Sequence, residues 1–242
     1  MKVTNLGTKD RVSCYIATEL YQFMAYHPDA RLGLATGGTM IEMYAHLVDL
    51  LNKNALDVSR IHTFNLDEYV GLEAAHPESY NYYMHHILFN RYPKFTEAFL
   101  HIPNGDVTDV YEEAKRYEAI LDQEGPIDIQ ILGIGQNGHI GFNEPGTSFD
   151  TETHCVNLTE STIEANSRYF DHKDDVPRQA ISMGLQSIMK AKRIILIALG
   201  ASKREAMTRL MTGEITPDLP ASILHQHPYV DVFVDDEAMP LI

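Results

Sequence analysis

The feature that most constrains the fold of this chain is a regular alternation between short apolar segments and longer segments with helical spacing. Short segments typical of strands occur at residues 31–35, 61–66, 127–133, 193–199 and 229–235, and those at 127–133 and 193–199 are almost continuously apolar. Such runs indicate strands buried on both faces, because a strand with one face in water alternates apolar and polar residues. Strands of this kind are typical of parallel sheets that are covered by helices.

Between these segments, apolar residues recur every three or four positions, as they do on the buried face of a helix. This spacing predicts helices over residues 8–25, 40–52, 78–90, 109–123 and 202–211. A further helix is predicted from about 177 to 190, since Pro177 suits a first helical turn. The order of elements predicts an α/β fold with a doubly wound, mostly parallel sheet and helices on both faces (Rossmann-like). Neither a repeat nor a low-complexity linker interrupts the 242 residues, so we expect a single domain over residues 1–242.

The charge and cysteine content exclude several classes of partner. The chain has 34 acidic and 19 basic residues and shows no basic stripe of the kind that binds nucleic acid. No apolar run approaches the roughly 20 residues needed to cross a bilayer, and the N-terminus lacks the features of a signal peptide. With two cysteines, Cys14 and Cys155, no disulfide framework is indicated. We therefore expect a cytoplasmic protein that acts on a small molecule, with neither nucleic acid nor membrane as a partner.

The first candidate ligand contact is "ATGGTM" (35–40), which follows the strand at 31–35. Ligands of parallel α/β sheets bind beyond the carboxyl ends of the strands. Gly37 and Gly38 let a ligand approach the backbone closely, and Thr39 is predicted to cap the next helix and leave N–H groups directed at a phosphate. The spacing is neither a Walker motif nor G-x-G-x-x-G, and a plain tight turn would explain the glycines equally well.

The second candidate is "NLDEYVGL" (65–72), which follows the strand at 61–66. Asp67 and Glu68 are adjacent, so in extended chain their side chains point to opposite sides. One carboxylate could enter a cleft while the other faces elsewhere. The alternative is that both are ordinary acids of a loop or of a helix N-terminus.

The third candidate is the glycine-spaced loop "LGIGQNGHIGFNEPG" (132–146). Within eight residues this loop presents two amides, an imidazole and a carboxylate: Asn137, Asn143, His139 and Glu144. The loop contains G-x-G-x-x-G, but Gly141 and Pro145 are incompatible with the helix that a dinucleotide site requires. A histidine near a carboxylate is a common pairing for proton transfer, so we predict a proton-handling site above a small ligand.

Two basic residues could contribute to an anion site. Lys203 lies in the first turn of a predicted helix, where a cation is unfavourable unless it faces an anion. Arg168 lies in a polar stretch that could fold over a ligand. Taken alone, each would be an ordinary solvated charge.

Neither a metal site nor a cofactor site is expected. The histidine pairs, at 85–86 and at 225 and 227, lack the spacing and the partners of zinc ligands. Tyr80, Tyr82 and Tyr83 are interpreted as helix-packing residues rather than as a stacking platform.

Taken together, the motifs resemble those of the glucosamine-6-phosphate deaminase family in order and spacing. The resemblance extends from about residue 30 to 234, and the combination of "LDEYVGL" with "GHIGFNEP" is the most specific part. The motifs that carry it are "LATGGTM", "FNLDEYVGL", "HPESYNYYM", "LGIGQNGHIGFNEPG", "ANSRYF" and "LGASKREA".

The resemblance implies conversion of D-glucosamine 6-phosphate and water to D-fructose 6-phosphate and ammonia, with neither metal nor organic cofactor. It implies that Asp67 moves a proton from C2 to C1, and that His139, oriented by Glu144, handles the proton on the ring oxygen during ring opening. It also implies a set of residues that hold the phosphate: Thr36, Gly37, Gly38, Thr39, Arg168 and Lys203.

This sequence departs from the family pattern at two places. Many members have an aspartate where this chain has Asn137, and an amide cannot act as a base. We hypothesise that activity survives with an altered pH profile. Members that are activated by N-acetylglucosamine 6-phosphate have basic residues after Asn-Glu-Pro and a longer C-terminal tail. The stretch 147–157 has neither Lys nor Arg, so we expect hyperbolic kinetics without that activator.

Alternative functions stay open at this point. The related 6-phosphogluconolactonases share the glycine loop but typically carry Asp-Glu-Arg at the position of Asp67-Glu68-Tyr69, and an isomerase or a sugar-phosphate sensor could use the same fold. Residues 150–178 are poor in apolar side chains, and we predict that they form a lid. The chain is compatible with a monomer or a small homo-oligomer.

Overall fold

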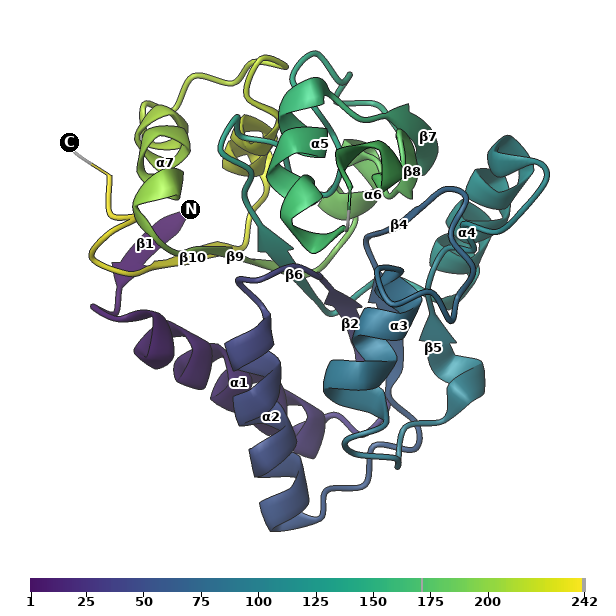
Figure 1. Ribbon diagram of the computed structural model, residues 1–242. Helices are drawn as coiled ribbons and strands as arrows, with labels where there is room; N and C mark the ends of the chain where they lie inside the picture. Colours follow the sequence, from purple (N-terminus) through teal and green to yellow (C-terminus); the bar gives the residue numbers. More distant parts are fainter. Residues whose placement is uncertain (171, 241–242) are drawn as a thin grey trace.

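The computed structural model describes residues 1–170 and 172–240. Within these residues the main element is a parallel sheet of seven strands, which runs through the middle of the molecule (Figure 1). In spatial order its strands are β1 (Lys2–Asn5), β10 (Val230–Val234), β9 (Arg193–Ala198), β6 (Ile129–Gly133), β2 (Arg31–Leu34), β3 (His62–Asn65) and β5 (Leu100–His101). The prediction of a mostly parallel α/β sheet is confirmed, and the short edge strands β1 and β5 are additions to it.

Helices cover both sides of this sheet. Figure 1 shows α1 (Lys9–Tyr26) and α2 (Ile41–Asn54) on one side and α5 (Glu160–Asn166), α6 (Leu185–Met189) and α7 (Arg204–Met211) on the other. The remaining helices are α3 (Tyr80–Met84), which continues as a π-helical turn over His85–Phe89, and α4 (Val110–Glu124). The predicted helical spans agree with α1, α2, α3 with its π turn, α4 and α7.

Cap residues explain where several helices begin. Thr8 accepts a hydrogen bond from the Arg11 N–H at the start of α1, and Asp109 accepts two at the start of α4. Each bond satisfies an N–H group that has no partner within the helix. The sheet between the helices is buried, as in β9, whose residues from Ile194 to Ala198 are all buried.

A second, antiparallel sheet of three strands is present among the described residues: β4 (Asp67–Tyr69), β8 (Gln179–Ser182) and β7 (His154–Asn157), with β8 in the centre. This sheet corrects the helix predicted from 177 to 190, since residues 179–182 form β8 and the helical part is limited to α6. Pairing with strands on both sides satisfies the backbone of β8 without a helix, and this pairing is invisible in the local sequence.

The segment predicted as a lid, 150–178, contains β7, α5 and short 3-10 turns over Ser167–Tyr169 and Lys173–Asp175. β7 belongs to the three-stranded sheet, so this end of the segment is tied to β8. Within the described part of the chain, no helix combines the length and the apolar character needed to cross a membrane. Cys14 and Cys155 are both free thiols.

Candidate active site

Apart from Arg168, which lies in the 3-10 turn after α5, the predicted site residues follow four strands that are neighbours in the sheet, in the order β9, β6, β2 and β3. Because the strands are parallel, the segments that follow them emerge at the same edge. From β2 the chain proceeds toward β3 and β5, and from β6 it proceeds toward β9 and β10. The direction of the strand order therefore changes between β2 and β6, which is where ligands of open α/β sheets bind.

Asp67 lies at the start of β4, directly after β3 and Leu66, and its side chain is buried, with 7% of its surface exposed. The glycine loop passes beside it, because a Cβ atom at Gly141 would lie 3.7 Å from Oδ2 of Asp67. Burial, with a smaller contribution from Glu68, raises the pKa of the Asp67 carboxyl from 3.8 to about 8. A carboxyl group with such a raised pKa is typical of an acid–base residue.

Glu68 points away from Asp67 and serves the N-terminus of α3. Its carboxylate accepts hydrogen bonds from the backbone N–H groups of Tyr69, Tyr80 and Asn81 at 2.8, 2.9 and 2.8 Å. Burial raises the pKa of Glu68 to about 7, although these three N–H donors act in the opposite direction. Of the two adjacent acids, Asp67 is thus the one beside the glycine loop.

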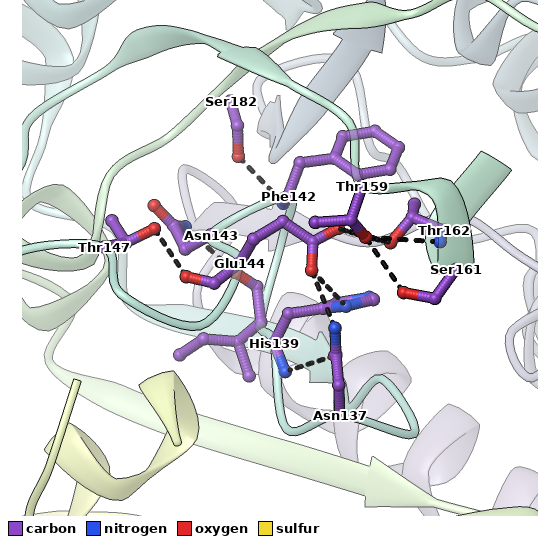
Figure 2. Close-up of polar contacts among 11 residues, drawn as sticks. Asn137, His139, Phe142, Asn143, Glu144, Thr147, Thr159, Ser161, Thr162 and Ser182 are labelled. Carbon is purple, nitrogen blue, oxygen red and sulfur yellow. Dashed lines mark hydrogen bonds and ion pairs between the residues drawn. The ribbon is translucent and has the colours of Figure 1, made fainter. Parts of the chain in front are cut away.

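Figure 2 shows two polar residues of the glycine loop, Asn137 and His139, directed at the carboxylate of a third, Glu144. Asn137 Nδ2 donates to Glu144 Oε2 at 2.8 Å, and His139 Nδ1 lies 3.5 Å from the same oxygen, which is an ion-pair distance. Asn137 also accepts a hydrogen bond from the His139 backbone N–H at 3.2 Å. The loop therefore holds the imidazole and the carboxylate together, as the sequence analysis predicted.

The other oxygen of Glu144 contacts two threonines that lie outside the loop. Thr162 and Thr159 both direct their hydroxyl groups at Oε1, Thr159 at 3.2 Å (Figure 2). Burial would raise the pKa of Glu144, but the neighbouring His139 imidazole and the hydrogen bonds from Thr162 and Asn137 lower it to about 2. Glu144 is consequently ionised across the physiological pH range.

At Gly135 the loop has no room for a side chain. A Cβ atom at this position would lie 2.3 to 2.5 Å from the Cε1, Nδ1 and Nε2 atoms of His139. The backbone N–H of Gly135 also donates to the His139 carbonyl at 2.8 Å. The imidazole thus packs flat on the glycine, and any larger residue would displace it.

The Asn143 side chain holds the loop in place through hydrogen bonds to backbone carbonyls and does not face a ligand. Its side chain is fully buried, and Nδ2 donates to the carbonyls of Ile140 and Met183 at 2.9 and 2.8 Å. The neighbouring Phe142 N–H donates to Ser182 Oγ at 3.0 Å. These bonds fasten the loop to β8 and to the residue that follows it.

The turn predicted to bind phosphate lies between β2 and α2, and its residues 36–39 are partly exposed. Gly37 has φ 102°, and its carbonyl accepts a hydrogen bond from the Tyr83 hydroxyl at 2.8 Å. The prediction that Thr39 caps α2 is wrong, because the residue that precedes the helix is Met40. Met40 is a further turn residue between Thr39 and the helix, and its N–H donates to the Gly37 carbonyl at 3.0 Å.

Lys203 and Arg168 come from different elements, the turn before α7 and the 3-10 turn after α5. Burial lowers the pKa of the Lys203 ammonium, and the positive charge of Arg168 lowers it further. The two cations are thus close enough to repel each other. A bound dianion beside them would offset that repulsion, which is the arrangement expected at a phosphate site.

Tyr80 has a place in the site that the sequence analysis did not assign to it. Burial raises the pKa of its hydroxyl well above the ordinary value, with smaller contributions from Tyr69 and Asp67, while a hydrogen bond with Thr36 acts in the opposite direction. Tyr80 is therefore close to both Thr36 and Asp67. Tyr80 is the first residue of α3, directly after Ser79, and the local sequence does not distinguish it from a packing residue.

None of the predicted site residues belongs to a group of possible metal ligands in the described part of the chain. Among the described residues, His62, His101 and Glu124 form one such group and Asp10, Glu42 and His46 another. In the first, Glu124 Oε2 contacts His62 Nδ1 at 2.7 Å and His101 Nε2 at 3.1 Å. His62 lies at the amino end of β3, whereas Asp67 follows the carboxyl end of that strand.

Comparison with known proteins agrees with this geometry. Residues 7–232 match the family described as glucosamine-6-phosphate isomerases/6-phosphogluconolactonase. The chain is 61% identical over 240 residues to a glucosamine-6-phosphate deaminase of Staphylococcus aureus, covering 99% of this chain and 95% of that protein. It also superimposes on the solved structure of a monomeric glucosamine-6-phosphate deaminase with TM-score 0.96 and 46% identity, covering 98% of each chain. A 6-phosphogluconolactonase from Trypanosoma cruzi, with TM-score 0.76 and 17% identity over 98% of this chain and 95% of that one, shares the fold. The chain therefore belongs to the glucosamine-6-phosphate isomerase/6-phosphogluconolactonase family.

Proposed function

We propose that this protein is a glucosamine-6-phosphate deaminase, which converts D-glucosamine 6-phosphate and water to D-fructose 6-phosphate and ammonia. The observation that carries the proposal is the position of Asp67. This buried carboxyl with a raised pKa lies against the loop that holds His139 and Glu144 together. The 61% identity to a relative of that name supports the same activity.

Binding begins at the phosphate. Lys203 and Arg168 supply positive charge, and the turn formed by residues 36–39 supplies backbone N–H groups. The phosphate is remote from the reacting carbons, so these contacts orient the sugar without taking part in the chemistry. Such binding energy fixes the reacting groups in place and reduces the entropy that the reaction must lose.

Ring opening is the work of His139 and Glu144. As the bond between C1 and the ring oxygen breaks, the hydroxyl at C1 loses a proton and the ring oxygen gains one. His139 handles the proton at the ring oxygen. The ionised Glu144, whose Oε2 lies 3.5 Å from Nδ1, orients the imidazole.

Isomerisation follows on the open chain and uses Asp67. Its carboxylate removes the proton from C2 and returns it to C1, while the C2 nitrogen gives up one proton and the C1 oxygen gains one. The double bond thereby moves from C1–O to C2–N and leaves a protonated imine at C2. Water adds to this imine, the C–N bond breaks, and ammonia and the C2 ketone are formed. The C2 ammonium of the bound sugar lies next to Asp67 in this scheme, and a neighbouring cation lowers the pKa of a carboxyl group. Substrate binding thus converts a protonated Asp67 to the base that the reaction needs.

The same proposal includes how the protein works as a whole. Residues 150–178 act as the lid, since Arg168 lies within them, and neither metal nor organic cofactor is used. The relative with TM-score 0.96 is described as monomeric, which supports a monomer over a small homo-oligomer for this chain. The substrate and product are small metabolites, in keeping with a cytoplasmic location.

The decisive experiment measures fructose 6-phosphate and ammonia together, with wild-type protein and with Asp67→Asn. Equal amounts of both products from the wild type and neither from the variant are expected. Hydrolysis of 6-phosphogluconolactone is measured in parallel, because a lactonase would act on that compound and release no ammonia from glucosamine 6-phosphate. A sensor would bind the sugar phosphate and form no product. Absence of ammonia from the wild type refutes the proposal.

A further inference from the structure

The carboxylate of Glu144 divides its contacts between two parts of the protein. Oε2 contacts His139 and Asn137, which belong to the same loop. Oε1 contacts Thr162 and Thr159, from the beginning of α5 (Figure 2). Since the two oxygens belong to one planar group, whatever holds Oε1 also sets the direction in which Oε2 faces the imidazole.

Thr162 is the better placed of the two threonines to hold Oε1. Its side chain is buried, with 5% of its surface exposed, and its hydroxyl donates to Glu144. Thr159 in turn donates to the Thr162 hydroxyl at 3.1 Å and caps α5 by accepting from the Thr162 N–H at 3.3 Å. A buried, ionised carboxylate is strongly destabilised when it loses a hydrogen-bond donor, because water does not replace the lost donor.

The same short segment reaches the phosphate-binding cations. α5 continues directly into the 3-10 turn Ser167–Tyr169, since the Ser167 N–H bonds to the carbonyls of Ile163 and Glu164. Arg168 lies in that turn, close enough to Lys203 to lower its pKa. One end of this segment thus contacts the carboxylate that orients His139, and the other end carries a cation of the phosphate site.

We propose that Thr162 is a positioning residue for ring opening: its hydroxyl fixes Glu144 so that Oε2 faces His139, and it makes this alignment depend on the placement of the segment that carries Arg168. The inference rests on the proposed deaminase activity and deepens it. Phosphate binding draws Arg168, and with it α5, into place, and Thr162 transmits that placement to the ring-opening pair. Alignment of the pair is thereby favoured when a phosphorylated sugar is bound.

The test compares three single variants in the full chain. Thr162→Val keeps the shape of the side chain and removes the hydroxyl, and we expect kcat to fall about ten- to hundredfold, the loss typical of a hydrogen bond to a charged group. Thr162→Ser keeps the hydroxyl and should retain kcat within about twofold, in line with small effects of conservative changes. Ser161→Ala is the matched control, since this neighbouring hydroxyl contacts Thr159 and not Glu144. It should also stay within about twofold of the wild type.

A linear ligand separates positioning from a general disturbance of the segment. Sorbitol 6-phosphate has the phosphate and carbon chain of the substrate but cannot close a ring. We expect its Kd to be the same for wild type and Thr162→Val, while kcat falls. An equal loss of kcat and of affinity for this ligand would show that the segment itself is displaced, and it would overturn the proposal.

Two other results would also overturn it: full activity of Thr162→Val, or failure of Thr162→Ser to restore kcat. Thermal unfolding identifies a variant that does not fold, in which case Thr162→Ala replaces Thr162→Val with the same expectation. Failure of the deaminase proposal is distinguishable, because the wild type itself would then release no ammonia.

Discussion

The replacement of Asp67 by asparagine should remove activity and, at alkaline pH, make the protein more stable. The size of the second effect follows from the burial of this carboxyl. Its pKa is raised from 3.8 to about 8, chiefly by desolvation and secondly by Glu68. Each unit of pKa corresponds to about 1.4 kcal/mol, so holding Asp67 ionised in the protein without substrate costs at most about 6 kcal/mol. Relaxation and water entry reduce such values in real proteins, and about 2–6 kcal/mol is the expected range.

The sign of the pH dependence follows from the direction of the shift. In the unfolded chain Asp67 loses its proton near its ordinary pKa of 3.8, whereas in the folded protein it keeps the proton to about pH 8. Between these values the folded state binds more protons, so the contribution of Asp67 to stability decreases as the pH rises. The asparagine variant has no such titration. Its free energy of unfolding should therefore increase relative to that of the wild type from about pH 4 to pH 8, and the difference should stay constant at higher pH.

Urea unfolding at pH 5, 6, 7, 8 and 9 measures this difference directly, because the midpoint and slope give the free energy of unfolding at each pH. Asp150→Asn, which makes the same atomic change at an exposed position, is the control and should show no comparable trend. A difference between Asp67→Asn and wild type that stays constant over this range would refute the reasoning. So would a variant that loses stability relative to the wild type as the pH rises.

Further predictions concern the loop and the phosphate site. Asn137→Asp places a second carboxylate where Nδ2 now lies 2.8 Å from Glu144, so the acid limb of the pH–rate curve should move to higher pH, and an unchanged curve would contradict this. Lys203→Gln should raise KM for glucosamine 6-phosphate about tenfold or more, whereas Lys203→Arg keeps the charge, and equal KM values would refute the role of the ammonium. Gly135→Ala should lower kcat about tenfold or more, because the new Cβ atom would lie 2.3 Å from His139 Cε1 and would displace the ring. Inhibition by inorganic phosphate should stay unchanged. Velocity should depend hyperbolically on substrate with or without N-acetylglucosamine 6-phosphate, and sigmoidal curves abolished by this compound would contradict the expectation.

The part of the fold that could be predicted consists of elements whose neighbours are close in sequence or whose faces are both buried. The strand at 193–199 is apolar from Ile194 onward, because β9 lies between two strands and under helices on both faces. Asp67, His139 and Lys203 could be singled out because each follows a strand that the sequence predicts. Their convergence then needed no more than the rule that parallel strands end at a common edge.

The rest depends on contacts between residues far apart in the sequence. β8 is a strand because β4 and β7 flank it, and nothing between 177 and 190 announces those partners. The hydroxyls that hold Glu144 come from 15 and 18 residues away, on a helix that the sequence analysis described only as a polar stretch. The sequence predicts only a packing role for Tyr80, because helical spacing does not reveal that its hydroxyl contacts Thr36 in the turn after β2.

The pairing of β4 with β8 has a consequence for how this family can change by insertion and deletion. Asp67 lies opposite Ser182, and Glu68 lies opposite Ile181. A shift of β4 by one residue would exchange the two acids, turning Glu68 toward the glycine loop and Asp67 toward the start of α3. Both acids would remain in the sequence, yet the carboxyl group beside the sugar would carry one more methylene, and α3 would lose the acceptor of its Tyr80 and Asn81 N–H groups. Single-residue length changes are therefore expected to be excluded between β3 and β4, where Leu66 is the sole connecting residue, and to be tolerated in the exposed turns that follow β4.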